Sequence, residues 1–372
     1  MRRVFEKYLL PGFVFQSAIV AGAYGSGAEF REFFMPFGPV GGLLAIVVVM
    51  VTLSIIAMVG LEFARTFRVY EYRSFMRGLL GRGWVLFEIL YILLMLLVLS
   101  VIGAAAGVVT EDILGLDGRW GTLVMMVTIG VLVFFGTTVI ERVLSLWSVV
   151  LYGVYVAFFI AHFEQFGSEI STALASDTVT SDWYVGGLRY SGLIIPVIAI
   201  MAFVARHLET RSDAIVAGAL SGPLIMIPAF LFYLAIVGHF DLIDSSRPNA
   251  IPLTVLLKVL EGGEVFAILF PVVLFGTFIE TGAAFIHAMN ERIAGTYEEQ
   301  GKSMPSWTRP AVAMVALVLT FFIADKVGLT ALIGQGYGTI TYAFMLVFGV
   351  PLLTVGVWKV LRGSPGLLAP GL

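Results

Sequence analysis

The chain has 372 residues, of which 59% are hydrophobic and 13% charged, and its formal net charge is −3. Soluble domains carry about 25% charged residues, so this composition excludes a water-soluble globule. Cysteine is absent, which excludes disulfides, thiol nucleophiles and thiolate metal sites. Apolar runs long enough for the ~20 helical residues that cross a bilayer recur along the chain, as expected of an all-α polytopic membrane protein.

Charges, prolines and glycines divide the hydropathy into ten predicted transmembrane helices. We expect them at about 11–36, 39–65, 84–109, 120–138, 142–163, 189–207, 212–238, 264–291, 309–325 and 331–360. The last is too long for one crossing, and Gly334, Gly336 and Gly338 predict a bend or re-entrant start. The Gly- and Pro-rich residues 363–372 are expected to form a disordered tail.

Positive charges gather on one side of this topology. The N-terminus and loop 66–83 are basic, whereas most of the charged residues in the stretch 164–189 are acidic. Because cytoplasmic loops hold the excess of lysine and arginine, we expect an integral plasma membrane protein with both termini in the cytoplasm. The arginine-rich segment 65–82 could also bind anionic lipid, but a role as a topology signal is sufficient to explain its charge.

The two halves of the chain resemble each other in plan. Residues 1–164 and 165–362 are each expected to form a five-helix repeat, with a long charged segment after the second helix. In one register Gly83 matches Gly263 and Glu111 matches Glu291. Repeats with an odd number of helices are inverted relative to one another, an arrangement of many secondary transporters. Chance agreement from shared hydropathy is the alternative.

The first span contains three glycines at bilayer depth, Gly22, Gly25 and Gly27, and then a carboxylate, Glu29. Glycine costs about 0.8–1 kcal/mol relative to alanine inside a helix, and unwound backbone at this depth requires a cavity or surrounding protein. We therefore predict a broken helix whose carbonyls ligate a cation, with an outer half-helix that starts near Ser26 and attracts anions. Close helix packing through small residues is the alternative.

The core Tyr24, Ser26, Gly27 and Glu29 resembles the first helix of the YkvI-like membrane proteins. The likeness extends more loosely through Ser212–Val237 and the C-terminal glycines, and departs at Ala21-Gly22-Ala23, where the glycines are shifted. It implies membership of the amino acid–polyamine–organocation superfamily and a LeuT-type 5+5 inverted repeat. In that fold helices 1 and 6 are broken and face each other. The resemblance also favours a small amino acid or related solute as the substrate, although it implies the architecture more firmly than the substrate.

The sixth span has few polar side chains and one proline, Pro196, which removes a backbone donor and can open the helix. A substrate at such a break would meet Ile, Met, Phe203 and bare carbonyls, which favours a cargo with an apolar part. An ordinary proline kink is the alternative.

The eighth span carries Thr277, Glu280 and Thr281 at i, i+3 and i+4, on one helical face. Hydroxyl and carboxylate oxygens suit a small hard cation. The resemblance implies a sodium site formed by this face with carbonyls of helix 1. The alternatives are threonines bonded to their own helix, a paired Glu280, or a proton site with His287 as partner.

Other motifs predict packing rather than chemistry. Gly103-x-x-x-Gly107 and Gly218-x-x-x-Gly222 are typical of closely packed membrane helices. Glu62 with Arg65, and Glu88 near Arg82, are expected to form interfacial ion pairs.

These features favour a secondary active transporter that moves a small organic solute by alternating access, coupled to Na+ or H+. The expected substrate-binding residues are Gly22, Tyr24, Gly25, Ser26, Gly27, Glu29 and Phe203. The expected ion-coupling residues are Ala21, Thr277, Glu280 and Thr281, the last three forming the Na+ site. The expected partners are the substrate and membrane lipids, with no nucleic acid, and no cofactor beyond the coupling ion.

Two other classes compete with this interpretation. An ion channel would need repeated pore loops, and only Gly336-Tyr337-Gly338 resembles filter chemistry. An intramembrane serine hydrolase would use Ser26 with His287 as base, but no further motif supports it, so we expect no catalytic residues and no enzyme activity.

Overall fold

The computed structural model describes residues 4–19, 23–135, 137–176, 179–200, 202–246 and 250–363, and the regular elements in these ranges are helices. Seven helical runs are long and apolar enough to cross a membrane, and two shorter apolar helices accompany them, Gly118–Val133 and Tyr184–Ile200. The predicted all-α polytopic membrane protein is therefore confirmed. The predicted disordered tail lies outside the described residues, except for Gly363.

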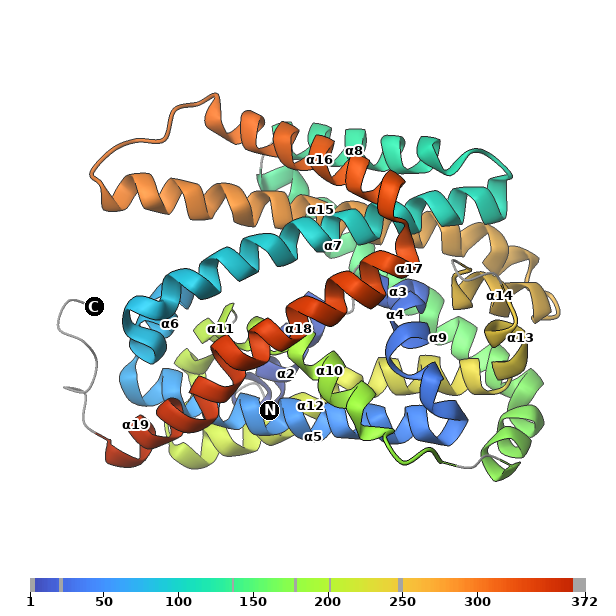
Figure 1. Cartoon of the computed structure of the whole chain (residues 1–372), viewed down its shortest axis with the longest axis horizontal. Coiled ribbons are helices and arrows are strands. Elements are labelled where there is room, and N and C mark those ends of the chain that lie inside the picture. The colour runs from blue at the N-terminus through green and yellow to red at the C-terminus, as the bar shows by residue number, and fades with distance from the viewer. Residues whose placement is uncertain are drawn as a thin grey trace.

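One layer of helices, which we call the bundle, has its two longest helices low in Figure 1. It consists of α2 (Leu10–Ile19), α3 (Ala23–Ser26), α4 (Ala28–Phe33), α5 (Gly38–Phe67), α10 (Tyr184–Ile194), α11 (Pro196–Ile200) and α12 (Arg211–Val237). Helices α5 and α12 pack closely because α12 presents glycines. A Cβ on Gly218 would lie 2.4 Å from Met58 Cα, and one on Gly222 would lie 1.9 Å from the Met50 carbonyl oxygen. The predicted packing role of this glycine motif is confirmed.

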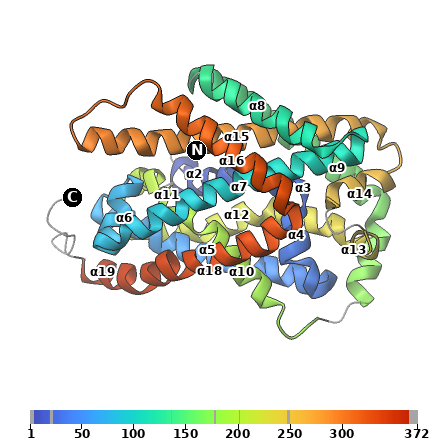
Figure 2. The same ribbon diagram turned by 45° about the horizontal axis from the view of Figure 1, so that its top comes forward.

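A second layer, which we call the scaffold, lies above α5 and α12 in Figure 1 and Figure 2. Its four helices are α7 (Trp84–Leu114), α8 (Gly118–Phe135), α15 (Glu264–Glu299) and α16 (Thr308–Val327). Each of α7 and α15 contacts both α8 and α16, so the four form one block. Glycine again sets the spacing, because a Cβ on Gly103 would meet the Met126 side chain at 2.8 Å and one on Gly107 would meet the Gly118 carbonyl oxygen at 3.1 Å.

The fifth and last predicted spans join the two layers. The fifth is α9 (Thr137–Ser176), which continues past its predicted end at 163 and has non-helical backbone at Phe166. The predicted repeat boundary at 164 lies inside this helix, and the division into repeats stays a prediction. The C-terminal run crosses the molecule diagonally (red in Figure 1). Its elements are α17 (Leu329–Ala331), η5 (Leu332–Tyr337), α18 (Gly338–Phe344), η6 (Met345–Gly349), η7 (Leu352–Gly356) and α19 (Val357–Arg362).

The predicted bend at the start of this last run takes the form of a π-helical segment. Residues Leu332–Tyr337 contain two of the three glycines and keep helical dihedrals, so the chain continues as one span over Leu329–Arg362 rather than as a re-entrant loop. A π-bulge inserts a residue without ending the helix, which lets a 34-residue run curve across the molecule.

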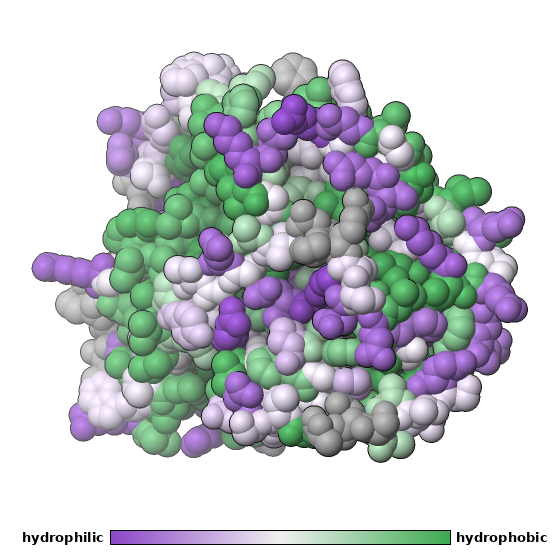
Figure 3. All heavy atoms as spheres, turned by 45° about the vertical axis from the view of Figure 1, so that its right-hand side comes forward, coloured by the Kyte–Doolittle hydropathy of each residue, from purple (hydrophilic) through white to green (hydrophobic). Residues whose placement is uncertain are grey.

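Short elements complete the chain. They are η1 (Phe5–Leu9), η2 (Met35–Phe37), α6 (Tyr72–Leu80), η3 (Gly81–Gly83), η4 (Ala202–His207), α13 (Phe240–Asp244) and α14 (Pro252–Val259). Hydrophilic side chains concentrate at the end of the molecule that carries α13 and α14, whereas hydrophobic ones cover much of the flank (Figure 3). Exposed Glu169, Asp241 and Asp244 belong to this end. This distribution suits a flank in lipid and an end in water.

Candidate functional site

Helix 1 is interrupted at Gly27, which separates α3 from α4. Its φ is +81°, a left-handed conformation that side chains rarely adopt. A Cβ at this position would also lie 2.5 Å from the Phe232 ring and 3.1 Å from Pro252. The predicted interruption between residues 21 and 27 is thus confirmed at its C-terminal end. Ala21 and Gly22 lie outside the described residues, as does the side chain of Tyr24.

The outer half-helix α4 starts where the sequence predicts, next to Ser26. The Ser26 Oγ is buried and accepts a hydrogen bond from the Ala28 N–H at 3.2 Å, while the Gly27 carbonyl oxygen accepts from the Phe30 N–H at 3.1 Å. A serine in this position satisfies one of the unpaired N–H groups of a helix start. Ser26 therefore holds the break in shape.

Glu29 joins α4, the second half of helix 1, to helix 6. Its side chain lies on the first turn of α4, the residue is 7% exposed, and it accepts a 2.7 Å hydrogen bond from the hydroxyl of Tyr190 on α10. The rings of Phe33 and Phe34 pack on Tyr190, with centroids 5.3 and 5.1 Å away. A carboxylate in so apolar a setting requires a donor, and Tyr190 supplies it. We call this contact the Glu29–Tyr190 joint.

Helix 6 is also broken, as predicted. Helix α10 ends at Ile194, Pro196 begins the short α11, and the chain continues as 3-10 helix over Ala202–His207. Pro196 lacks an N–H and so cannot extend the hydrogen bonding of α10. Phe203, which we expected to contact substrate, is 44% exposed and thus stands apart from the buried residues of the break.

A second polar contact lies one turn beyond the Glu29–Tyr190 joint, and the sequence reasoning missed it. Glu32 and Arg189 approach to 3.9 Å, and Arg189 lies over the Phe33 ring at 5.4 Å. The C-terminal run closes over the pair, because the Thr341 hydroxyl donates to the Arg189 carbonyl oxygen at 2.9 Å. The sequence did contain a signal for this contact: Glu32 follows Glu29 by three residues, so both carboxylates lie on the same face of α4.

The α3 side of the break is held by α9. The hydroxyl of Tyr155 donates a hydrogen bond to the carbonyl oxygen of Gly25, and its ring packs edge-on against Phe270 of α15 at 5.2 Å. A Cβ on Gly25 would lie 2.8 Å from that hydroxyl and 3.5 Å from the Leu274 side chain. The backbone of α3 therefore lies against α15, one turn from Thr277.

The predicted cation face of α15 is present, with its hydroxyls engaged. Thr277 is fully buried and donates to the Val273 carbonyl oxygen at 2.8 Å, and Thr281, 8% exposed, donates to the Thr277 carbonyl oxygen at 2.9 Å. Each hydroxyl oxygen keeps lone pairs that can face a cation. Over the described part of the chain, no group of three or more His, Cys, Asp or Glu could hold a metal. A cation here would depend on hydroxyl and carbonyl oxygens together with Glu280.

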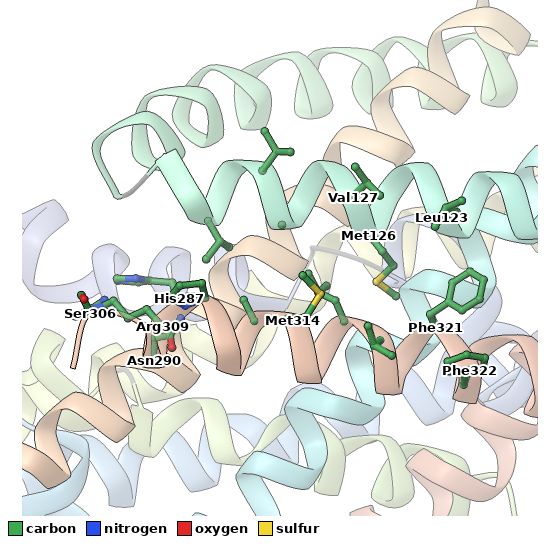
Figure 4. Close-up of a pocket in the computed structure, with 17 residues that line it drawn as sticks. Leu123, Met126, Val127, His287, Asn290, Ser306, Arg309, Met314, Phe321 and Phe322 are labelled. Carbon is green, nitrogen blue, oxygen red and sulfur yellow. The ribbon is translucent and has the colours of Figure 1, made fainter. Parts of the chain in front are cut away.

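The residues around the break are buried, and three cavities lie elsewhere in the described part of the chain. One has about 1110 Å³ and lies between α8, α15 and α16 (Figure 4). Two others, of about 830 and 730 Å³, lie at the α12–α13 turn and between α7, α8 and α16. None of these three is lined by Gly25, Ser26 or Glu29.

No protein-family model and no curated protein matches the sequence. Solved structures do match it. A Na+-coupled sialic acid symporter, substrate-bound and outward-open, has a TM-score of 0.59 at 13% identity, covering 97% of this chain and 90% of its own. Mhp1, a nucleobase-cation-symport-1 family transporter closed around bromovinylhydantoin, has a TM-score of 0.62 at 16% identity, covering 95% and 78%.

A manganese transporter of Eremococcus coleocola has a TM-score of 0.54 at 14% identity, covering 99% of this chain and 85% of its own. At such low sequence identities, these structural matches show a shared fold and nothing about the substrate. The predicted LeuT-type fold with broken helices 1 and 6 is thus confirmed. The membership of the YkvI-like family and its superfamily is not confirmed and stays a prediction.

Proposed function

We propose that the chain is a secondary active transporter that moves a small organic solute by alternating access. The observation that carries this proposal is the Glu29–Tyr190 joint, a buried 2.7 Å contact between the outer halves of two broken helices. Broken helices leave backbone groups available at mid-membrane, where transporters of this architecture bind their cargo. A contact between two half-helices can form and separate as the outer side closes and opens.

The substrate binds at the interruption of helix 1, next to Gly25, Ser26 and Gly27. The buried Glu29 favours a cationic group, such as the amino group of an amino acid or a related compound. The N-terminus of α4 lies beside it and attracts an anionic group, so the two together suit a zwitterion. Gly22 and Tyr24 are further substrate-binding residues in this proposal, and Ala21 is assigned to the coupling ion.

Transport is coupled to a cation that binds between helix 1 and α15. Thr277, Glu280 and Thr281 supply side-chain oxygens, and the backbone of α3 lies beside this part of α15. Oxygen ligands of this kind favour Na+ over a proton relay, although Glu280 by itself could carry H+. The basic loops place the N- and C-termini in the cytoplasm, so α13 and α14 face outward.

Uptake into proteoliposomes tests this function. Vesicles of purified protein with an imposed Na+ or H+ gradient are expected to accumulate at least one solute from a panel of zwitterionic amino acids and amines. The Glu29→Gln variant is expected to change which solutes are accepted. A sustained single-channel conductance would instead show a channel, and identical solute selectivity in both proteins would remove Glu29 from the site.

The hydrolase alternative loses support because its two residues lie in different surroundings. Ser26 is buried at the break and caps α4, whereas His287 lines the cavity between α8, α15 and α16. A serine nucleophile needs its base within hydrogen-bond reach.

A further inference from the structure

The cavity between α8, α15 and α16 has two chemically different ends, and we call it the α16 groove. Leu123, Val127, Phe321 and Phe322 lie at one end, and His287, Asn290, Ser306 and Arg309 gather at the other (Figure 4). Its apolar wall includes Met314 and Val318, which are 65% and 48% exposed. An open apolar trough with one polar end has the shape of an amphiphile whose head lies at the loop between α15 and α16.

The length of the groove matches an acyl chain. From Arg309 to Phe322 the helix rises about 20 Å at 1.5 Å per residue. The hydrocarbon part of one leaflet is about 15 Å thick, half of the ~30 Å hydrocarbon core, so the groove is long enough for an acyl chain of that leaflet. Trp307, 69% exposed, stands beside the polar end, where aromatic side chains mark the membrane interface. The groove therefore runs from the interface to the depth that the end of a lipid tail reaches.

The polar end contains an acceptor that the protein leaves unsatisfied. Asn290 is 2% exposed, and within the described part of the chain its Oδ1 has no hydrogen-bond partner. A buried acceptor of this kind costs about 1–3 kcal/mol unless a donor reaches it. Asn290 belongs to the groove lining, so a bound molecule can supply that donor.

The charges at this end select the kind of headgroup. Arg309 Nη1 contacts Glu291 Oε1 at 2.7 Å, and these side chains are 45% and 50% exposed, so the pair is neutral in sum and open to solvent. A zwitterionic headgroup suits such a pair, with its phosphate toward Arg309 and its cation toward Glu291 and Asn290.

We propose that the α16 groove binds one glycerophospholipid with a primary-amine headgroup, of the phosphatidylethanolamine class. The ammonium N–H groups donate to Asn290 Oδ1, the phosphate accepts from Arg309, and an acyl chain occupies the apolar trough. Phosphatidylcholine has no N–H donor, and phosphatidylglycerol carries a net charge that the Arg309–Glu291 pair does not neutralise. The proposal does not depend on transport activity.

Native mass spectrometry of the full-length protein released from nanodiscs tests this binding. In discs of equal phosphatidylethanolamine, phosphatidylcholine and phosphatidylglycerol, the wild type is expected to retain one phosphatidylethanolamine about tenfold over the other two. Asn290→Leu is expected to bring the three lipids to equal retention. Equal retention by the wild type, or unchanged selectivity in Asn290→Leu, would overturn the proposal.

A second pair of variants keeps the test independent of Asn290. Met314→Trp places a large ring in the trough and is expected to abolish retention of the lipid. Val315→Trp is the matched control, because Val315 is equally exposed at 66%, lies next to Met314 and does not line the groove. Equal lipid retention in these two variants, or a dimer that covers the groove without lipid, would also contradict the proposal.

Discussion

The bundle and the scaffold both use glycine for close helix packing, but in the bundle glycine also interrupts a helix. At the break, Gly27 provides a left-handed backbone that ends one half-helix and starts another. In the scaffold, Gly103, Gly107 and Gly121 lie inside continuous helices and let them approach closely. Close packing fixes the scaffold, whereas the bundle contains interruptions bridged by single polar contacts. A division of this kind gives a transporter one rigid part and one part that can rearrange around the site.

Replacing these glycines is expected to give the largest effects and to separate the two roles. Gly27→Ala combines a left-handed φ with contact against Phe232, at a cost of about 2–5 kcal/mol. We expect it to stop transport even in protein that remains folded.

Gly121→Ala is the scaffold counterpart of that change. Its Cβ would lie 1.9 Å from Thr110 Oγ1, so overpacking should lower thermal stability by about 1–3 kcal/mol. Protein that remains folded is expected to keep its substrate KM. Melting curves and uptake assays on both variants test this contrast, and an active Gly27→Ala protein would show that the break is not required.

Loss of the Glu29–Tyr190 joint is expected to give the next largest effect. Tyr190→Phe leaves a buried carboxylate without its donor, a cost of about 1–3 kcal/mol, and uptake should fall about tenfold. A double-mutant cycle with Glu29→Gln should show coupling, because the two residues form one contact.

Thr110→Val is the scaffold control for the joint. Thr110 is also buried, but it donates only to its own helix, to the Ala106 carbonyl oxygen at 2.8 Å. We expect near wild-type uptake from it. Additive effects of the two changes at the joint would disprove a functional link between Glu29 and Tyr190.

Substitution of Thr281 compares two threonines with the same local hydrogen bonding. Thr281→Ala is expected to raise the half-saturating Na+ concentration about tenfold, which corresponds to 1.4 kcal/mol. The control is Thr320→Ala, since Thr320 is buried in α16 and donates to the Ala316 carbonyl oxygen at 2.7 Å but lies outside the proposed ion site. Uptake measured against Na+ concentration checks both. If transport instead follows the pH gradient and Glu280→Gln alone abolishes accumulation, the coupling ion is H+.

Local sequence signals predicted the fold well and the contacts between helices poorly. The glycines of helix 1 and Pro196 disclosed both breaks, because backbone conformation depends on the residues at that position. Tyr190 and Tyr155 were not predicted as partners of the break, since each lies more than 100 residues from the residue it contacts.

The ion pairs also show that the sequence predicts local contacts better than contacts between distant helices. Arg65 pairs with Glu62 at 2.7 Å, three residues away and as expected, whereas Glu88 pairs with Arg292 at 2.8 Å and not with the neighbouring Arg82. Hydropathy places a residue at a depth in the membrane, but the packing of distant helices decides its partner.

A change of pH is expected to have a small effect on stability at the end of the bundle where α12 meets α13. His239 is half-buried at the start of α13, outside the membrane-spanning helices, and burial lowers its pKa below the usual 6.5, while Glu169 acts in the opposite direction. The unfolded chain therefore binds a proton more readily than the folded one. Stability from this residue is complete above pH 6.5 and declines as the pH falls through 6.5 toward the lower pKa of the folded state.

His239→Gln is expected to reduce this pH dependence. Partial exposure screens the charge, so the difference between pH 7.5 and 5.5 should stay below about 1 kcal/mol. Thermal melting of both proteins across this range measures it, and His207→Gln serves as the control because His207 lies on η4 at the other end of the bundle. The same loss of stability in wild type and His239→Gln would assign the pH response to other groups. A smaller loss in the variant would assign part of the pH response to His239 at the α12–α13 turn.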